Sequence, residues 1–279
     1  MEDLKSARAF FETLGASYPV HDQVTIEPLT LGGVEIYRFT PAAVVSPEVV
    51  IFTHGGAYMY GSIQSHRAMV SHLAAATGRV MLFVEYALAP EHPFPTALNQ
   101  TTAVISEWLR TRPGTPFALM GDSAGGNLAM STALNLQQLK LASPVYQVLI
   151  SPWLNMQTTA ASYTENEKLD PILNKALIDH AASQYTRRSN YANPLVSPVL
   201  GAFTGFNPTL TLVGAQEILR DDSLQLHSAL ERYGSRSKLE VFDHVTHVWT
   251  LTDIAGPASR QALRLMRAFM DEVTAGVMV

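Results

Sequence analysis

The residues with the clearest potential for chemistry form one glycine-rich stretch near the middle of the chain. An apolar run ends at Gly121, Ser123 follows two residues later, and Gly125 and Gly126 begin a second apolar run. This Gly-x-Ser-x-Gly pattern is typical of a nucleophile elbow, a sharp strand-to-helix turn with the serine at its apex. The helix N-terminus beneath the hydroxyl favours negative charge. An ordinary glycine-rich turn can carry the same pattern, so the partners of the serine decide between the two.

A serine hydroxyl becomes a good nucleophile only when a base removes its proton, and the usual base is a histidine held by a carboxylate. In an open parallel sheet the candidates lie on loops after the C-terminal ends of strands, where Ser123 also opens. His247 lies five residues past a strand-like run that ends at Phe242, and it is the preferred base. His244 in the same loop is the alternative, whereas His54 adjoins glycines and is expected to be structural. Four other histidines fall in predicted helices, where packing or solvation is expected: His66, His72, His180 and His227.

The carboxylate has three candidates in the loop after another apolar run, which ends at Gly214. Glu217 lies closest to the end of this predicted strand, where the acid of such a triad projects, and it is preferred. Asp221 and Asp222 compete with it, but they are expected instead to cap the helix that follows.

Attack on an ester carbonyl builds an alkoxide that needs hydrogen-bond donors already in place. His54-Gly55-Gly56-Ala57 directly follows a third apolar run, and two consecutive glycines free backbone N–H groups to point at a ligand. An HGG-type loop together with an elbow forms an oxyanion hole. We therefore expect the N–H groups of Gly55, Gly56 and Ala124 to be the donors.

Apolar periodicity predicts the elements that position these residues. Strands alternating with helices imply right-handed crossovers and a mostly parallel sheet covered on both faces, which is an α/β fold. The first two strands, joined by Gly32-Gly33, are expected to form a hairpin. The predicted strands are 24–30, 34–40, 49–53, 79–85, 117–121, 146–150, 209–214 and 239–242, and the predicted helices outside the insertion described next are 3–14, 62–77, 96–112, 124–139, 222–233 and 258–274.

The alternation pauses at about residues 152–205, which are richer in Asn, Thr and Ser. One helix is predicted there, begun by Asp170 as its N-cap with Pro171 in its first turn. An insertion between two core strands that has its own apolar face is expected to lie over another part of the molecule. The expected buried stripe of its helix is Leu173, Leu177, Ala181 and Tyr185.

The bulk composition narrows the class of protein. Of 279 residues, 47% are apolar and 15% charged, which is enough for a large core in a single α/β unit. The formal charge is −5, and Lys and Arg are scattered, so the sequence shows no basic cluster of the kind that binds nucleic acid. No apolar run reaches the ~18 residues of a membrane span, and the acidic N-terminus is unlike a secretory signal, so a cytoplasmic location is expected. The absence of cysteine excludes disulfides, thiolate metal sites and a cysteine nucleophile.

Together, several segments resemble the hormone-sensitive-lipase-like group of α/β-hydrolase esterases, the family IV bacterial esterases. They occur in order between about residues 48 and 250. They are His54-Gly-Gly-Ala-Tyr58, Tyr86-Ala-Leu-Ala-Pro-Glu-His-Pro-Phe-Pro95, Gly121-Asp-Ser-Ala-Gly-Gly126, Tyr191-Ala-Asn-Pro-Leu-Val-Ser-Pro198 and the Glu217–Asp221 segment.

The resemblance implies an α/β-hydrolase fold, with a mostly parallel central sheet, flanking helices and a helical cap. In this division the catalytic core comprises residues 23–154 and 206–279, and the cap comprises residues 1–22 and 155–205. The resemblance also implies that Ser123 is the nucleophile, with the base and the oxyanion donors at the positions named above.

Three positions depart from the family pattern. The acid, usually the first aspartate of an Asp-Pro-Leu-Arg-Asp run, is Glu217, which can still orient a histidine. The arginine of the usual Tyr-Arg-Leu-Ala-Pro run is Ala87, so an ion pair expected beside the active-site wall is missing. The usual His-Gly-Phe after the base is His247-Val248-Trp249, a bulkier pair that is expected to narrow the pocket.

The residues and the resemblance favour a serine carboxylesterase that cleaves short- to medium-chain acyl esters through an acyl-enzyme, without metal or cofactor. Its expected partner is a small-molecule ester, with no nucleic acid and no membrane. An amidase or lactonase would use the same triad, and a non-catalytic receptor on the same fold is a weaker alternative. A homodimer through residues 239–242 is also compatible with the sequence. The expected pocket residues are Tyr58, Tyr191, Leu195 and Trp249.

Overall fold

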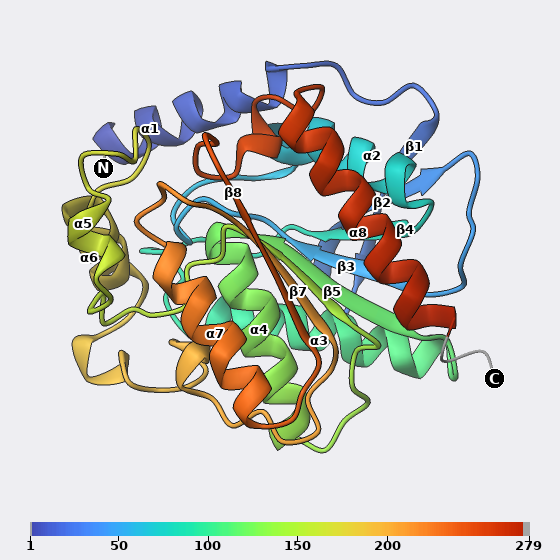
Figure 1. Cartoon of the computed structure of the whole chain (residues 1–279). Coiled ribbons are helices and arrows are strands. Elements are labelled where there is room, and N and C mark those ends of the chain that lie inside the picture. Colours follow the sequence, from blue (N-terminus) through green and yellow to red (C-terminus); the bar gives the residue numbers. More distant parts are fainter. Residues whose placement is uncertain (1, 276–279) are drawn as a thin grey trace.

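A single eight-stranded sheet forms the centre of the molecule (Figure 1). The structure is a computed structural model that describes residues 2–275. The strand order is β1-β2-β4-β3-β5-β6-β7-β8; the pairs β1–β2 and β2–β4 are antiparallel, and every other neighbouring pair is parallel. The strands are β1 (Val24–Leu31), β2 (Val34–Pro41), β3 (Val49–Thr53), β4 (Val80–Val84), β5 (Phe117–Asp122), β6 (Gln147–Ile150), β7 (Thr209–Gly214) and β8 (Ser237–Phe242).

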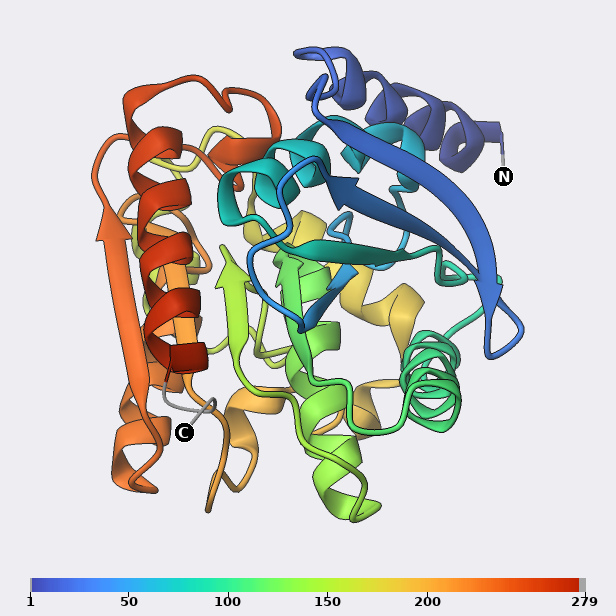
Figure 2. The same cartoon turned by 90° about the vertical axis from the view of Figure 1, so that its right-hand side faces the viewer.

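Two layers of helices cover this twisted sheet (Figures 1 and 2). On one face α2 and α8 share a core with Val50 and Phe52 of β3, and on the other face α3, α4 and α7 share a core with Val49 and Ile51. Alternate residues of β3 therefore reach opposite cores, as expected of a strand buried on both faces. The α-helices are α1 (Glu2–Glu12), α2 (Ile63–Thr77), α3 (Thr96–Thr111), α4 (Ser123–Gln138), α5 (Ser162–Glu165), α6 (Lys175–Tyr185), α7 (Arg220–Arg232) and α8 (Pro257–Ala275).

The structure confirms the predicted order of strands and helices outside the insertion, with boundaries that differ by no more than about two residues. The expected hairpin is also present, because Leu31 pairs with Val34 across a turn in which Gly32 and Gly33 both have positive φ. Within residues 2–275, no helix is long and apolar enough to cross a membrane. The mostly parallel α/β fold follows directly from the periodicity of the sequence.

The helix predicted to begin at Asp170 begins later, so this prediction is wrong. Asp170 accepts the N–H groups of Ile172 and Leu173, both at 2.9 Å, and thereby closes a short turn. The N-cap of α6 is Asn174, whose side chain accepts the N–H of Leu177. The shifted start also rotates the buried stripe, which leaves the Leu177 side chain exposed. The buried residues of α6 are Ile178, Ala181, Ala182 and Tyr185.

A buried ion pair joins α8 to the starts of two central strands. Arg79, which directly precedes β4, donates to Glu48 at 3.0 Å, and both side chains are only 1% exposed. The same guanidinium lies 2.7 Å from Asp271 of α8, and the Tyr146 hydroxyl donates to Glu48 at 3.1 Å. Removing one partner of such a pair leaves the other charge buried without compensation.

We expect Arg79→Met to lower the free energy of unfolding by about 3–5 kcal/mol, because the Glu48 carboxylate then stays buried without its charged partner. Arg267→Met is the matched control, since Arg267 pairs with the same Asp271 but through an exposed contact. The control should cost less than about 1 kcal/mol. Urea unfolding of both variants at neutral pH measures the difference, and equal losses would contradict a special role for the buried pair.

Candidate active site

The elbow places Ser123 where β5 turns into α4. Ser123 has a φ of 51° and is 8% exposed. A Cβ on Gly121 would lie 2.4 Å from the carbonyl oxygen of Gly125, and a Cβ on Gly125 would lie 1.9 Å from that of Thr53. No side chain fits at either distance. The two glycines therefore allow β3, β5 and α4 to pass close together beneath the serine.

Ser123, His247 and Glu217 form a continuous chain of hydrogen bonds. The Ser123 Oγ lies 2.9 Å from His247 Nε2, and His247 Nδ1 lies 2.7 Å from Glu217 Oε2. The three residues follow β5, β8 and β7, respectively. Because the C-terminal ends of parallel strands share one edge of the sheet, loops that are distant in sequence converge there. The preferred base and the preferred acid of the sequence analysis thus lie together with the serine.

The Glu217 carboxylate is held in place from several sides. It is 1% exposed, and its Oε1 accepts the N–H of Gly214 at 2.6 Å and the hydroxyl of Ser151 at 2.7 Å. The insertion after β6 adds two more contacts: Asn166 donates to the Glu217 carbonyl at 2.9 Å, and Asp170 accepts the N–H of the next residue at 3.0 Å. A glutamate with this support can orient a histidine as an aspartate does.

The surroundings of His247 suit a base. Burial lowers the pKa of the imidazole, but the hydrogen bond and negative charge of Glu217 outweigh burial, so the pKa lies above its ordinary value of 6.5. If Nδ1–H donates to Glu217, the neutral ring presents the Nε2 lone pair to the hydroxyl of Ser123. The arrangement can therefore accept the serine proton and stabilise the imidazolium that results.

The competing candidates lie outside this chain of hydrogen bonds. His244 is exposed in the turn after β8. The Asp221 carboxylate accepts the Ser162 N–H at 2.9 Å and pairs with Arg220. The N-terminus of α7 has no side-chain cap, so the expectation that Asp221 and Asp222 cap this helix is wrong.

Asp222 is instead a buried anchor for the insertion that follows β6. Its Oδ2 accepts the N–H groups of Leu154 and Asn155 at 2.8 and 3.0 Å, and the hydroxyl of Tyr163 at 2.9 Å. Burial raises the pKa of this carboxyl to about 7. Local sequence patterns do not reveal this role, because these partners lie 59–68 residues away.

The glycine loop after β3 differs from expectation at one donor. The N–H of Gly55 donates to Asp122 Oδ1 at 3.0 Å, so it is already occupied and the prediction of Gly55 as an oxyanion donor is corrected. A Cβ on Gly55 would lie 2.2 Å from Asp122 Oδ2, which explains the glycine. Over residues 2–275, by contrast, no hydrogen-bond partner is found for the N–H groups of Gly56, Ala57 and Ala124.

Buried side chains behind this loop explain its shape. Asp122 Oδ2 lies 3.5 Å from Nε2 of the buried His66, whose Nδ1 lies 2.9 Å from Ser65 Oγ. The His54 ring stacks on Tyr86 at 4.2 Å, and burial lowers its pKa to about 3, so His54 is structural as expected. The sequence offered one signal for Asp122, namely an acidic residue directly before the elbow serine.

Of the four expected pocket residues, Tyr58 and Trp249 are buried in the cores, and Leu195 is partly buried. Tyr58 is 1% exposed, and its hydroxyl donates to Asn127 at 2.8 Å. Trp249 is 4% exposed, with its ring 4.8 Å from that of Phe242. Leu195 packs against the same core as Tyr58. The bulk of Trp249 is therefore used in packing against β8.

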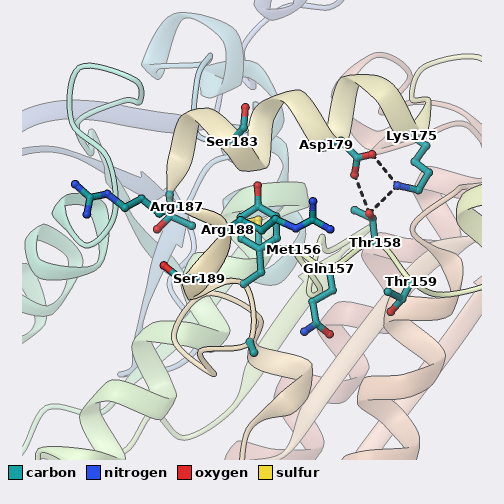
Figure 3. A pocket seen from close by; sticks show the side chains of 13 residues that line it. Met156, Gln157, Thr158, Thr159, Lys175, Asp179, Ser183, Arg187, Arg188 and Ser189 are labelled. Carbon is teal, nitrogen blue, oxygen red and sulfur yellow. Dashed lines mark hydrogen bonds and ion pairs between the residues drawn. The ribbon is translucent and has the colours of Figure 1, made fainter.

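Tyr191, the fourth, lines a cavity of about 700 Å³ built from the insertion after β6 (Figure 3). Inside it Lys175 Nζ lies 2.6 Å from Asp179 and 2.9 Å from the Thr158 hydroxyl. No residue of the serine–histidine–glutamate chain lines this cavity, and its charged walls do not suit an acyl chain. The other charged lining residues are Arg187 and Arg188.

The chain is similar in sequence and fold to known proteins. A profile of the alpha/beta hydrolase fold matches residues 50–251. An acetyl-hydrolase of Streptomyces hygroscopicus is 33% identical over 226 residues, which are 81% of this chain and 76% of its relative. The crystal structure of an esterase from the bacterial hormone-sensitive lipase family is 33% identical with a TM-score of 0.92, covering 96% of this chain and 91% of that one. EstE5 soaked with p-nitrophenyl butyrate is 30% identical with a TM-score of 0.91, covering 98% and 92%.

The chain belongs to the hormone-sensitive-lipase-like group of the α/β-hydrolase family. Within this group, two of its departures now have a structural context. Glu217 occupies the acid position without breaking the hydrogen-bond chain. At Ala87, where the arginine is missing, the backbone N–H donates to Gln100 at 2.7 Å. In the described part of the chain, no group of three or more His, Asp or Glu side chains could hold a metal ion.

We expect Glu217→Gln to lower kcat on the order of 10³–10⁴-fold, because the amide no longer fixes the imidazole tautomer. Glu217 raises the pKa of His247, so its removal should lower that pKa. On acidification, the residual activity of the variant should therefore begin to fall at a lower pH than the activity of the wild type does. Asp221→Asn is the control and should change kcat less than about threefold. Steady-state rates from pH 5 to 9 test both points, and a larger loss in the control would move the acid to Asp221.

We expect Asp122→Ala to lower kcat about tenfold or more with little change in KM, because the buried Gly55 N–H loses its acceptor and the glycine loop shifts. Asp122→Asn keeps an oxygen acceptor and should retain more activity. Steady-state kinetics of both variants give the separate effects on kcat and KM. If kcat falls as far in the asparagine variant as in the alanine variant, the carboxylate charge and not the hydrogen bond is what matters.

Proposed function

We propose that this member of the group is a serine carboxylesterase in which Ser123 is the nucleophile, His247 the base and Glu217 the acid. The observation that supports it most directly is the unbroken hydrogen-bond chain that joins these three side chains. The names of similar proteins, an acetyl-hydrolase and several esterases, support ester hydrolysis over amide hydrolysis. A non-catalytic receptor would not need a base aligned on the elbow serine.

The proposed reaction has two halves. In the first, Ser123 Oγ attacks the ester carbonyl as His247 Nε2 takes the serine proton. The N–H groups of Gly56, Ala57 and Ala124 stabilise the alkoxide, with Ala57 in place of the occupied Gly55. Collapse of the intermediate breaks the C–O bond, and the imidazolium gives its proton to the leaving alcohol. In the second half, water attacks the acyl-enzyme by the same steps and releases the acid.

Short- to medium-chain acyl esters are the proposed substrates. The acetyl-hydrolase among the relatives and the p-nitrophenyl butyrate soaked into EstE5 support small acyl groups. The proposed cap comprises residues 1–22 and 155–205, and Figure 1 places α5 and α6 at the same end of the molecule as the N-terminus. A cytoplasmic location and a homodimer through β8, the last strand of the sheet, remain predictions.

We expect Ser123→Ala to lower p-nitrophenyl butyrate hydrolysis by about 10⁴-fold or more, while circular dichroism and thermal unfolding stay close to those of the wild type. An organophosphate should label Ser123 stoichiometrically in the wild type, because only an activated serine reacts readily. Ser106→Ala, which removes an exposed hydroxyl on α3, is the matched control for rate and labelling. Retained turnover in Ser123→Ala, or labelling elsewhere, would reject the assignment. In the wild type, rates for a series of acyl chain lengths define how long an acyl group the pocket accepts.

A further inference from the structure

One side chain of the N-terminal helix reaches two backbone carbonyls next to the glycine loop. Arg8 of α1 donates from Nε to the Met59 carbonyl at 2.8 Å and from Nη2 to the Ala89 carbonyl at 2.9 Å. The same guanidinium forms a bidentate ion pair with Glu91, from Nη1 to Oε1 at 2.8 Å and from Nη2 to Oε2 at 2.7 Å. Arg8 therefore joins α1 to two segments, which lie 51 and 81–83 residues away from it in sequence.

The first carbonyl belongs to the turn that carries the proposed oxyanion donors. The N–H groups of Met59 and Tyr60 both donate to the Gly56 carbonyl, at 2.9 and 2.8 Å, which closes the turn over these residues. The Ala89 N–H donates to the Tyr58 carbonyl at 2.8 Å, so the segment after β4 lies directly against the turn. By binding the carbonyls of Met59 and Ala89, Arg8 holds both sides of this contact.

The turn needs support because its backbone is strained. Gly56 has a φ of 109°, and the non-glycine residues Ala57 and Tyr58 have φ values of 55° and 61°. A non-glycine residue keeps this conformation only where its surroundings enforce it. The inner end of the loop is fixed by the bond from Gly55 to Asp122. Arg8 supplies a bond at the outer end.

The Arg8 guanidinium also pairs with Glu91, which follows Ala89 in the same segment. The pairing lowers the pKa of Glu91 to about 2, so the carboxylate keeps its charge throughout the neutral range. Because both side chains are partly exposed, solvent screens the ion pair, and the bonds to the two carbonyls carry the positional constraint.

We propose that Arg8 is a positioning residue for ester hydrolysis, which holds the outer end of the oxyanion turn and so makes the N-terminal helix part of the catalytic apparatus. The inference rests on the proposed function, because it concerns the alkoxide formed during attack by Ser123. Loosening the turn moves the N–H groups of Gly56 and Ala57 away from the alkoxide while leaving ground-state binding of the ester nearly unchanged. Arg8 then acts on kcat more than on KM.

The test compares Arg8→Ala, Arg8→Lys and Glu12→Gln with the wild type. Glu12 is the matched control, since it accepts the Ser62 hydroxyl and so also docks α1 but binds neither carbonyl. Steady-state kinetics with p-nitrophenyl butyrate give kcat and KM. A trifluoromethyl ketone, whose adduct with Ser123 carries an alkoxide, gives the affinity for the oxyanion directly. Thermal unfolding checks that each variant is folded.

We expect Arg8→Ala to lower kcat about ten- to a hundredfold with KM within about twofold, and to weaken the ketone by a similar factor. Arg8→Lys should lie between alanine and the wild type, because an ammonium can hold one carbonyl but lacks the fork. Glu12→Gln should behave as the wild type. Unchanged kcat and ketone affinity in Arg8→Ala, or equal losses in Glu12→Gln, would overturn the inference. A wild type that neither hydrolyses the ester nor binds the ketone would instead reject the proposed function.

Discussion

The close approach of β3, β5 and α4 around Gly121 and Gly125 is the constraint on which the site depends. Because a Cβ on Gly125 would collide with the backbone of Thr53, the end of β3 lies directly against the elbow. The Thr53 hydroxyl reinforces the contact by donating to the Gly125 carbonyl at 2.7 Å. This contact of β3, β5 and α4 therefore determines the positions of both the Ser123 hydroxyl and the start of the glycine loop. Rigid backbone fixes the geometry of attack before any flexible side chain contributes, which is how electrostatic preorganisation is achieved.

Three buried carboxylates then join distant parts of the chain to the region where β3, β5 and α4 meet. Asp122 holds the glycine loop, Asp222 holds the chain leaving β6, and Glu217 holds His247. Backbone N–H groups offset the cost of burying each of them. The three differ in what else they face. Asp222 meets the hydroxyl of a buried tyrosine, Asp122 lies behind the oxyanion loop, and only Glu217 meets a histidine whose second nitrogen reaches the serine. Position relative to the elbow, and not acidity, separates the proposed catalytic carboxylate from the structural ones.

What the sequence could predict follows from which signals are local. Ser123 is marked by the glycines beside it, and His247 and Glu217 are marked by their distance from strand ends, so sheet topology was enough to bring them together. The occupied N–H of Gly55 and the anchoring role of Asp222 depend on partners 59–68 residues away, which periodicity does not report. Aspartate is a good N-cap, so the sequence predicts a helix start at Asp170. Its carboxylate instead closes a local turn and binds the loop of Glu217, a contact 48 residues away.

The N-terminal helix shows why a cap cannot be treated only as a cover over a finished site. The resemblance assigns residues 1–22 to the cap, and in the structure Arg8 of this segment binds the backbone beside the proposed oxyanion turn. Ala57 and Tyr58 are held at positive φ, and such a conformation persists only where neighbouring groups enforce it. The enforcing contacts come from two directions, from Asp122 beneath the loop and from the helix outside it. Displacing the helix would thus release strain stored in the proposed oxyanion donors, so that the position of the helix and the stabilisation of an alkoxide are coupled in the proposed mechanism.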